Sequence, residues 1–175
     1  MGEKNLKIFK NKLFLGLSFI IALVLIAFSY SKIKEYIVLK DVFVFTKENV
    51  VSIWRVKKGD TTHDYDYKLE SNDIDFLSDI LGSSKLKEAD RTDSPSNTLG
   101  NMTILLDGET REEGGGIAVE FKRGITLTPI DKEQVYVFLD INKPINDGSF
   151  NSVGVMQKSY IIHSEELVEF ISKNT

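Results

Sequence analysis

The longest hydrophobic run of the chain lies near its amino terminus. Residues 13–30 contain 18 consecutive uncharged side chains, nearly all of them apolar. As an α-helix this run would extend roughly 27 Å, close to the hydrocarbon thickness of a bilayer. No polar face interrupts it between Leu13 and Ala27, unlike the pattern of a helix that packs on a soluble core. We therefore expect residues 13–30 to form a transmembrane anchor.

A cleaved signal peptide is the alternative interpretation of the same run. Signal peptides have a shorter apolar stretch, of about 7–15 residues, followed by small residues at the cleavage site. Ala27 and Ser29 supply small side chains at a suitable spacing, but Phe28 and Tyr30 fit such a site poorly. The length of the run favours the uncleaved anchor, and cleavage would instead release a secreted domain.

Charges on either side of the run predict its orientation. Residues 1–12 contain four lysines and one acidic residue, whereas residues 31–41 mix three lysines with Glu35 and Asp41. Because loops rich in Lys and Arg stay on the cytoplasmic side, we expect residues 1–12 to be a cytoplasmic tail. Residues 31–41 then form a juxtamembrane linker, and residues 42–175 form a domain outside the cytoplasm at the cell membrane.

After residue 41 the pattern changes to short stretches rich in β-branched and aromatic residues. The stretch 64–70 alternates strictly, with Tyr65, Tyr67 and Leu69 on one face and charged residues on the other. Turn-rich sequences separate these stretches, at residues 90–101, 107–116 and 142–148. We expect strands at residues 42–45, 50–56, 64–70, near 86, and at 102–106, 117–122, 125–128, 135–141 and 159–162.

Two segments have the helical spacing of apolar residues instead. The first begins at Ser71 or Asn72 and stops near Gly82, and the second follows the N-cap Ser164. Together the elements predict an α+β fold, in which an antiparallel sheet of about six to eight strands packs against two helices on one face or end.

Composition excludes several functions. Residues 35–175 contain 16 Lys and Arg against 25 Asp and Glu, a net charge of 16 − 25 = −9. An acidic domain argues against nucleic acid as a partner, because phosphate binding needs a basic face. Cysteine is absent from the sequence, so thiol catalysis and disulfides are excluded. The triplet at 114–116 lacks the Lys-Ser/Thr signature of a phosphate loop, and we expect no cofactor.

The densest group of possible metal ligands is Asp60, His63, Asp64 and Asp66. Asp64 and Asp66 would point the same way from a strand, and a loop Asp60 could join them around calcium. The glycine and terminal glutamate of an EF-hand loop are missing, so a solvated strand face is the favoured interpretation.

A second candidate is the acidic stretch containing Glu109, Glu112 and Glu113. These side chains predict a contact loop for a basic protein partner, with a solvated loop as the simpler alternative. Aromatic residues on the expected strands, such as Trp54 and Tyr65, belong to a core unless several share an exposed face, where they would form a binding platform.

No coherent catalytic set accompanies these features, and the sequence is more typical of a binding protein than of an enzyme. We expect a membrane-anchored, extracytoplasmic protein-interaction module, with an immunity, inhibitor or accessory envelope role. A carboxylate-based hydrolase is the alternative, since paired acids leave no sequence motif. A cation- or ligand-sensing domain is a further one. The layout resembles that of small single-pass exported proteins of Gram-positive bacteria, a similarity that assigns no functional residue.

Overall fold

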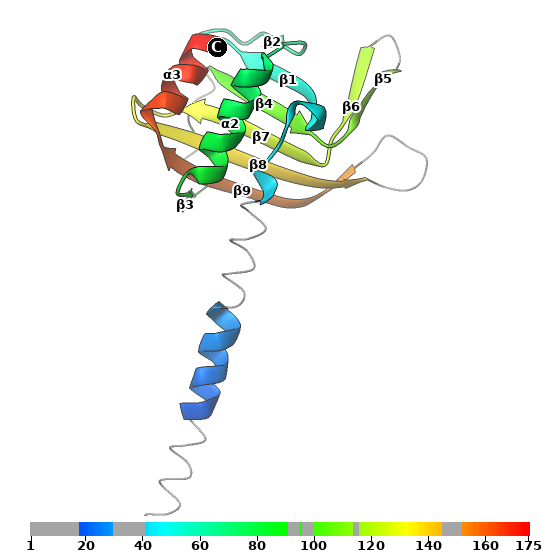
Figure 1. Cartoon of the computed structure of the whole chain (residues 1–175). Helices are drawn as coiled ribbons and strands as arrows, with labels where there is room; N and C mark the ends of the chain where they lie inside the picture. Colours follow the sequence, from blue (N-terminus) through cyan, green and yellow to red (C-terminus); the bar gives the residue numbers. More distant parts are fainter. Residues whose placement is uncertain (1–17, 30–40, 91–94, 96–99, 114–115, 145–151) are drawn as a thin grey trace, which may run out of the picture. The chain divides into compact units, whose positions relative to one another are not determined.

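The computed structural model describes residues 18–29, 41–90, 95, 100–113, 116–144 and 152–175 (Figure 1). The chain divides into two compact units, Met1–Asp41 and Val42–Thr175. We describe each unit separately.

In the first unit, residues 18–29 form an α-helix. Large apolar side chains on all sides of this helix are 50–65% exposed. The helix lies inside the expected anchor, of which residues 13–17 and 30 fall outside the described part of the chain. Within the described residues, no helix combines the length and the apolar character needed to cross a membrane. The exposed side chains are those of Phe19, Ile20, Ile21, Leu23, Val24, Leu25, Ile26 and Phe28.

The second unit is built on a seven-stranded antiparallel sheet with the strand order β2-β1-β4-β7-β8-β9-β3. A separate two-stranded sheet, β5-β6, connects the inner strands β4 and β7 and projects from their ends (Figure 1). The strands are β1 (Val50–Val56), β2 (His63–Asp64), β3 (Lys87–Glu88), β4 (Asn101–Leu106), β5 (Glu109–Glu113), β6 (Gly116–Glu120), β7 (Arg123–Pro129), β8 (Gln134–Pro144) and β9 (Ser152–His163).

Two helices, α2 (Ser71–Ser83) and α3 (Glu165–Asn174), cover one face of the large sheet (Figure 1). Their apolar stripes are buried, at Leu77 and Leu81 in α2 and at Leu167 and Ile171 in α3. Strand register places apolar residues in rows across the sheet, and each fully buried Leu or Ile contributes about 1.5–3 kcal/mol. One row consists of Ile53, Ile104, Ile125 and Leu139, and the next of Met102, Leu127, Val137 and Tyr160.

The α+β prediction is therefore confirmed, and the large sheet has a strand number within the expected range. Both expected helices are present. Ser164 caps α3 as predicted, its hydroxyl accepting a hydrogen bond from the Leu167 amide at 3.1 Å. The cap of α2 is Glu70, one residue before the expected position.

Residues 42–45 are not the strand that we expected. Val42 is helical, Phe43 lies in a turn, and residues 44–46 are irregular; Phe43 and Phe45 are buried in the core. The backbone of this segment is bonded by side chains instead of a β ladder, because Ser78 accepts from the Phe45 amide and Arg123 donates to nearby carbonyls. A short 3-10 helix, η1 (Lys47–Asn49), leads from this segment into β1.

Three other boundaries differ from the prediction. The strand expected at 64–70 is limited to His63–Asp64, after which the chain leaves the edge of β1. The stretch expected to be a loop at 107–116 contains strand β5, whose polar sequence gave no strand signal. Strands β8 and β9 extend beyond the expected 135–141 and 159–162, through residues 142–144 and 152–158, because they pair with each other as a long hairpin.

Candidate functional site

A cavity of about 620 Å³ lies at the outer edge of β1. We call it the β1 cavity. Four parts of the chain line it: β1 with η1, the irregular segment 65–69, helix α2 through Ile74, and the β5-β6 hairpin, which contributes Thr110 and Val119. Short β2 accounts for its position, since β2 pairs only with Arg55 and Val56 and leaves the first half of β1 without a strand on this side.

The interior of the β1 cavity is mainly apolar. Ile53, Leu69 and Ile74 also belong to the domain core, with at most 8% of each residue exposed. Val50 and Val51 of β1 are half-buried and line the same space. A bulge in β1 between Val50 and Ser52 interrupts the regular pairing with β4 at this point.

An aromatic cluster forms one side of the cavity. The rings of Trp54 and Tyr65 meet edge to face, with centroids 5.2 Å apart, and His63 stacks on Tyr65 at 5.3 Å. The indole N–H of Trp54 donates to the Ser52 hydroxyl at 2.9 Å, which in turn donates to the Tyr65 carbonyl at 3.1 Å. These contacts hold Trp54 in place beside Tyr65, which is 58% exposed. Trp54 and Tyr65 therefore lie together on the cavity, whereas a binding platform made by them stays a prediction.

Tyr67 fixes the irregular segment against the sheet. Its amide donates to the Ile53 carbonyl at 3.2 Å, and its hydroxyl donates to the Asn174 side chain at 2.6 Å. The guanidinium of Arg55 lies 3.9 Å from the centre of the Tyr67 ring, a cation–π contact, and forms an ion pair with Asp64 at 2.9 Å. The same Arg55 donates to the Asn174 carbonyl at 3.1 Å. The wall formed by residues 65–69 is therefore supported from both β1 and α3.

The hairpin wall depends on a tight approach of two backbones. A Cβ atom added at Gly108 would lie 1.8 Å from the Glu120 carbonyl oxygen, so only glycine fits where β4 turns into β5. Asp107, the preceding residue, adopts φ +56°, which is uncommon for a residue with a side chain. Register pairs Thr110 with Val119, and both line the cavity.

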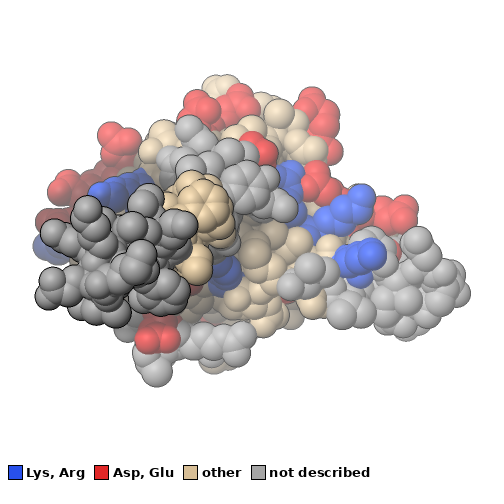
Figure 2. Space-filling model, turned by 90° about the horizontal axis from the view of Figure 1, so that it is seen from below, with Lys and Arg blue, Asp and Glu red and all other residues tan. Residues whose placement is uncertain are grey.

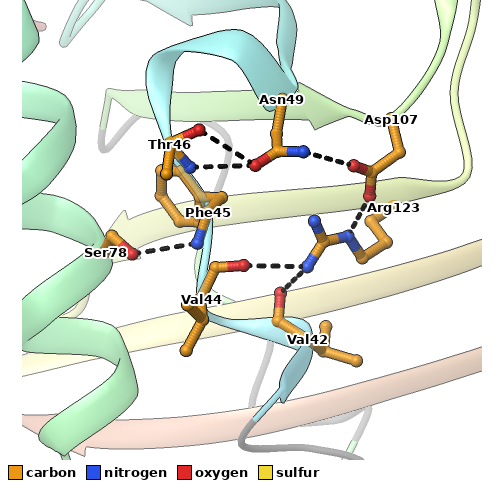
Figure 3. Close-up of polar contacts among 8 residues, drawn as sticks. All are labelled: Val42, Val44, Phe45, Thr46, Asn49, Ser78, Asp107 and Arg123. Carbon is orange, nitrogen blue, oxygen red and sulfur yellow. Dashed lines mark hydrogen bonds and ion pairs between the residues drawn. The ribbon is translucent and has the colours of Figure 1, made fainter.

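A polar network holds this turn to the segment that enters the domain (Figure 3). Arg123 forms an ion pair with Asp107 and donates to the carbonyls of Val42 and Val44 at 2.8 and 3.2 Å. Asn49 donates to the other Asp107 oxygen at 3.0 Å. Because Asp107 adjoins Gly108, the same contacts fix both the entering chain and the base of the hairpin.

The four candidate cation ligands are engaged separately. Asp60 accepts hydrogen bonds from the backbone amides of Thr61 and Thr62, and the bonds from Thr62 contribute most to lowering the pKa of its carboxyl. Asp64 pairs with Arg55, His63 stacks on Tyr65, and Asp66 lines the β1 cavity. Among the described residues, no three His, Asp or Glu side chains gather as a metal site would require. The cation site stays a prediction.

The acidic candidates lie on the β5-β6 hairpin. Glu109 opposes Glu120, and Glu113 opposes Gly116. Glu112 is exposed and shares the face of β5 that carries Thr110, since they are two residues apart along the strand. One end of the proposed contact surface thus adjoins the β1 cavity.

Charge in the cavity lining differs from that of the domain. The lining contains two lysines, Lys47 and Lys68, and one carboxylate, Asp66, so its net charge is positive. Residues 35–175 as a whole have a net charge of −9. Figure 2 shows blue side chains in separate groups among red ones, without one continuous basic area on the described residues in view. The paired carboxylates of a glycosidase are not found in the lining formed by described residues.

Neither a protein-family model, nor a curated protein, nor a solved structure matched the chain in our comparisons. The site therefore rests on its geometry. The sequence pattern singles out Trp54, Tyr65 and Asp66 of the lining, but it indicates neither the cavity nor the roles of Gly108 and Arg123. The Asp107-Gly108 pair, a common turn signal, was the one local indication of a second hairpin.

Proposed function

We propose that this chain is a membrane-tethered interaction module that holds residues 42–175 outside the cytoplasm, where they bind a protein partner. One observation carries the tether: eight large apolar side chains from Phe19 to Phe28 are at least half exposed. Complete burial of a fully exposed side chain of this kind contributes about 1.5–3 kcal/mol, so covering the exposed part of all eight would yield on the order of 10 kcal/mol. A bilayer around the full run 13–30 supplies that cover on every side of a helix.

The partner part of the proposal is supported by the β5-β6 hairpin. It forms a sheet separate from the large one, its first strand contains Glu109, Glu112 and Glu113, and it lines the same cavity as Tyr65, a residue that is 58% exposed. Acidic groups together with an aromatic anchor suit a basic protein surface, with the charges favouring association and the aromatic ring contributing affinity. An immunity protein, an inhibitor or an accessory subunit of an envelope complex would each use such a surface.

The tether is tested by alkaline carbonate extraction of cell membranes. The full-length protein is expected in the membrane pellet, and the double variant Leu23→Asp/Ile26→Asp in the supernatant, because each charge at a helix centre opposes insertion by about 2.5–3.5 kcal/mol. The apolar exchange Leu23→Ile/Ile26→Leu is the control and should behave like wild type. A mature protein that begins after Ser29 and is free in the medium would show that the tether is wrong.

The partner is tested with a photo-crosslinking residue at Glu112 in intact cells. We expect a discrete adduct with one protein, and a lower yield when Glu109 is changed to Lys. The matched control is the same crosslinker at Glu169, an exposed glutamate on α3. Equal adducts from both positions, or none from Glu112, would contradict a partner on the hairpin. Protease added outside intact cells should also digest residues 42–175, and their protection would contradict the orientation.

A further inference from the structure

The β1 cavity has the size and lining of a small-molecule site. Its volume of about 620 Å³ falls within the range of roughly 300–1,000 Å³ that is common for ligand pockets. Core residues Leu69 and Ile74 form part of its interior, and half-buried Val50 and Val51 extend this apolar surface toward solvent. Water molecules find few hydrogen-bond partners in such a space, so an apolar group is the favoured occupant.

The charges of the lining indicate which polar group the apolar occupant should carry. Lys47, on η1, and Lys68, on the irregular segment, are exposed lysines that contribute to the wall. Lys47 donates a hydrogen bond of 3.3 Å to the uncharged Ser71 hydroxyl, and its charge also acts on the adjacent carboxylate of Glu48, which lies outside the lining. With Asp66 as the one lining carboxylate, the cavity has a net positive charge of 2 − 1 = +1 within an acidic domain. An anionic head group is therefore attracted here and repelled by most of the remaining surface.

We propose that the β1 cavity binds a small amphiphile that has an apolar chain and a carboxylate head. The chain lies between β1 and the β5-β6 hairpin against the Trp54 ring, and the carboxylate lies near Lys47 and Lys68. The site goes beyond the protein-binding function proposed above and requires no protein partner, although both use Tyr65 at the mouth of the cavity. Their tests are separate, because the crosslink from Glu112 reports the partner and Trp54 emission reports the amphiphile. Failure of one proposal leaves the other intact.

Trp54 makes the proposal directly measurable, since it is the single tryptophan of the chain and lines the cavity. The full-length protein is reconstituted in dioleoylphosphatidylcholine vesicles and titrated with 10-bromodecanoate, whose bromine quenches tryptophan emission at short range. The neutral analogue 10-bromodecanol is titrated in parallel, and free concentrations are measured for both. We expect saturable quenching of Trp54, with the carboxylate binding about three- to tenfold tighter than the alcohol, as two partly exposed lysines allow.

Three variants locate the binding. Lys47→Gln/Lys68→Gln should abolish the difference between carboxylate and alcohol, while Lys122→Gln, an exposed lysine outside the lining, should preserve it. Val119→Phe should fill the cavity and abolish saturable quenching by both probes. If circular dichroism shows that Val119→Phe does not fold, the lysine variants still test whether the carboxylate binds beside Lys47 and Lys68. Quenching that does not saturate, that is equal for both probes, or that survives in Lys47→Gln/Lys68→Gln with the same preference would overturn the proposal.

Discussion

Replacement of Arg123 by leucine is the sharpest test of how the domain is held together. Arg123 connects two distant parts of the chain, because it pairs with the Asp107 carboxylate and donates to the carbonyls of Val42 and Val44, which lie 81 and 79 residues away in the sequence. The side chains of Arg123 and Asp107 are 16% and 27% exposed, so water replaces the lost partners only in part. The Val44 bond is exposed, and its carbonyl can be solvated readily.

These contacts set the expected magnitude. A hydrogen bond to a charged group contributes about 1.5–3 kcal/mol, and a charge left unpaired in a partly buried site adds to the loss. Discounting the exposed bond, we expect Arg123→Leu to lower the free energy of unfolding by about 3 kcal/mol. At a urea dependence of about 2 kcal/mol per molar, the midpoint would fall by about 1.5 M. Arg123→Lys, which keeps the charge but not the fork of donors, should lose about half as much.

Urea unfolding of the full-length protein in a mild detergent, followed by Trp54 emission, measures both changes. Lys122→Leu is the matched control, because it removes a positive charge from the neighbouring exposed position and should alter stability by about 0.5 kcal/mol or less. Hydrogen exchange at the Phe45 amide, which donates to Ser78, reports whether residues 42–46 are released first. Equal midpoints for Arg123→Leu and Lys122→Leu would refute the view that this network fastens the domain.

Four further outcomes are expected from the structure. Tyr160→Phe should stabilise the domain by about 1 kcal/mol in thermal unfolding, because the buried Tyr160 hydroxyl finds no hydrogen-bond partner among the described residues. Burial, and secondarily Glu88, raises the pKa of Tyr160 to about 12. Between pH 10 and 12 the Tyr160 hydroxyl is therefore deprotonated in the unfolded chain but still protonated in the folded one, which favours unfolding. The free energy of unfolding of wild type should fall by roughly 2 kcal/mol across this range, and that of Tyr160→Phe should not. Ser164→Ala, which removes the α3 cap, should lower stability by about 1 kcal/mol in urea. Gly108→Ala should cost about 1–3 kcal/mol because the hairpin backbone must move, whereas Gly82→Ala, in a helix with ordinary contacts, should leave stability equal or higher by urea titration.

The sequence predicted those elements that are determined by residues close to one another in the chain. The helical spacing of Leu77 and Leu81 and the cap at Ser164 correspond to α2 and α3, because these patterns are set within a few turns of chain. Strands β1, β4, β7, β8 and β9 of the large sheet likewise correspond to stretches rich in β-branched and aromatic residues. Their lengths were not predicted, since β8 and β9 stabilise each other beyond the apolar stretches.

The errors lie where distant contacts override local preference. Alternation predicted a strand through Tyr65 and Tyr67, yet Tyr67 is held by Arg55 and by Asn174, more than 100 residues later. The candidate site could not be predicted for the same reason, because it depends on contacts between distant residues. Its walls come from residues near 50, 67, 110 and 119, and neither their proximity nor the positive charge of the lining follows from any pattern in one stretch. Charge composition, which is negative overall, even indicated the opposite sign.

The bonds from Arg55 and Tyr67 to Asn174 also order events in time. They span 119 and 107 residues, so the β1 edge and the wall of the cavity cannot be completed until the segment containing α3 has been synthesised. Contacts between residues so far apart in the sequence form late in folding, because the entropy cost of closing the long loop comes before the energy gained from the contact. A nascent chain that still lacks α3 would therefore remain loosely folded. Late closure of this kind is compatible with the export that we propose, in which the polypeptide crosses the membrane before it folds.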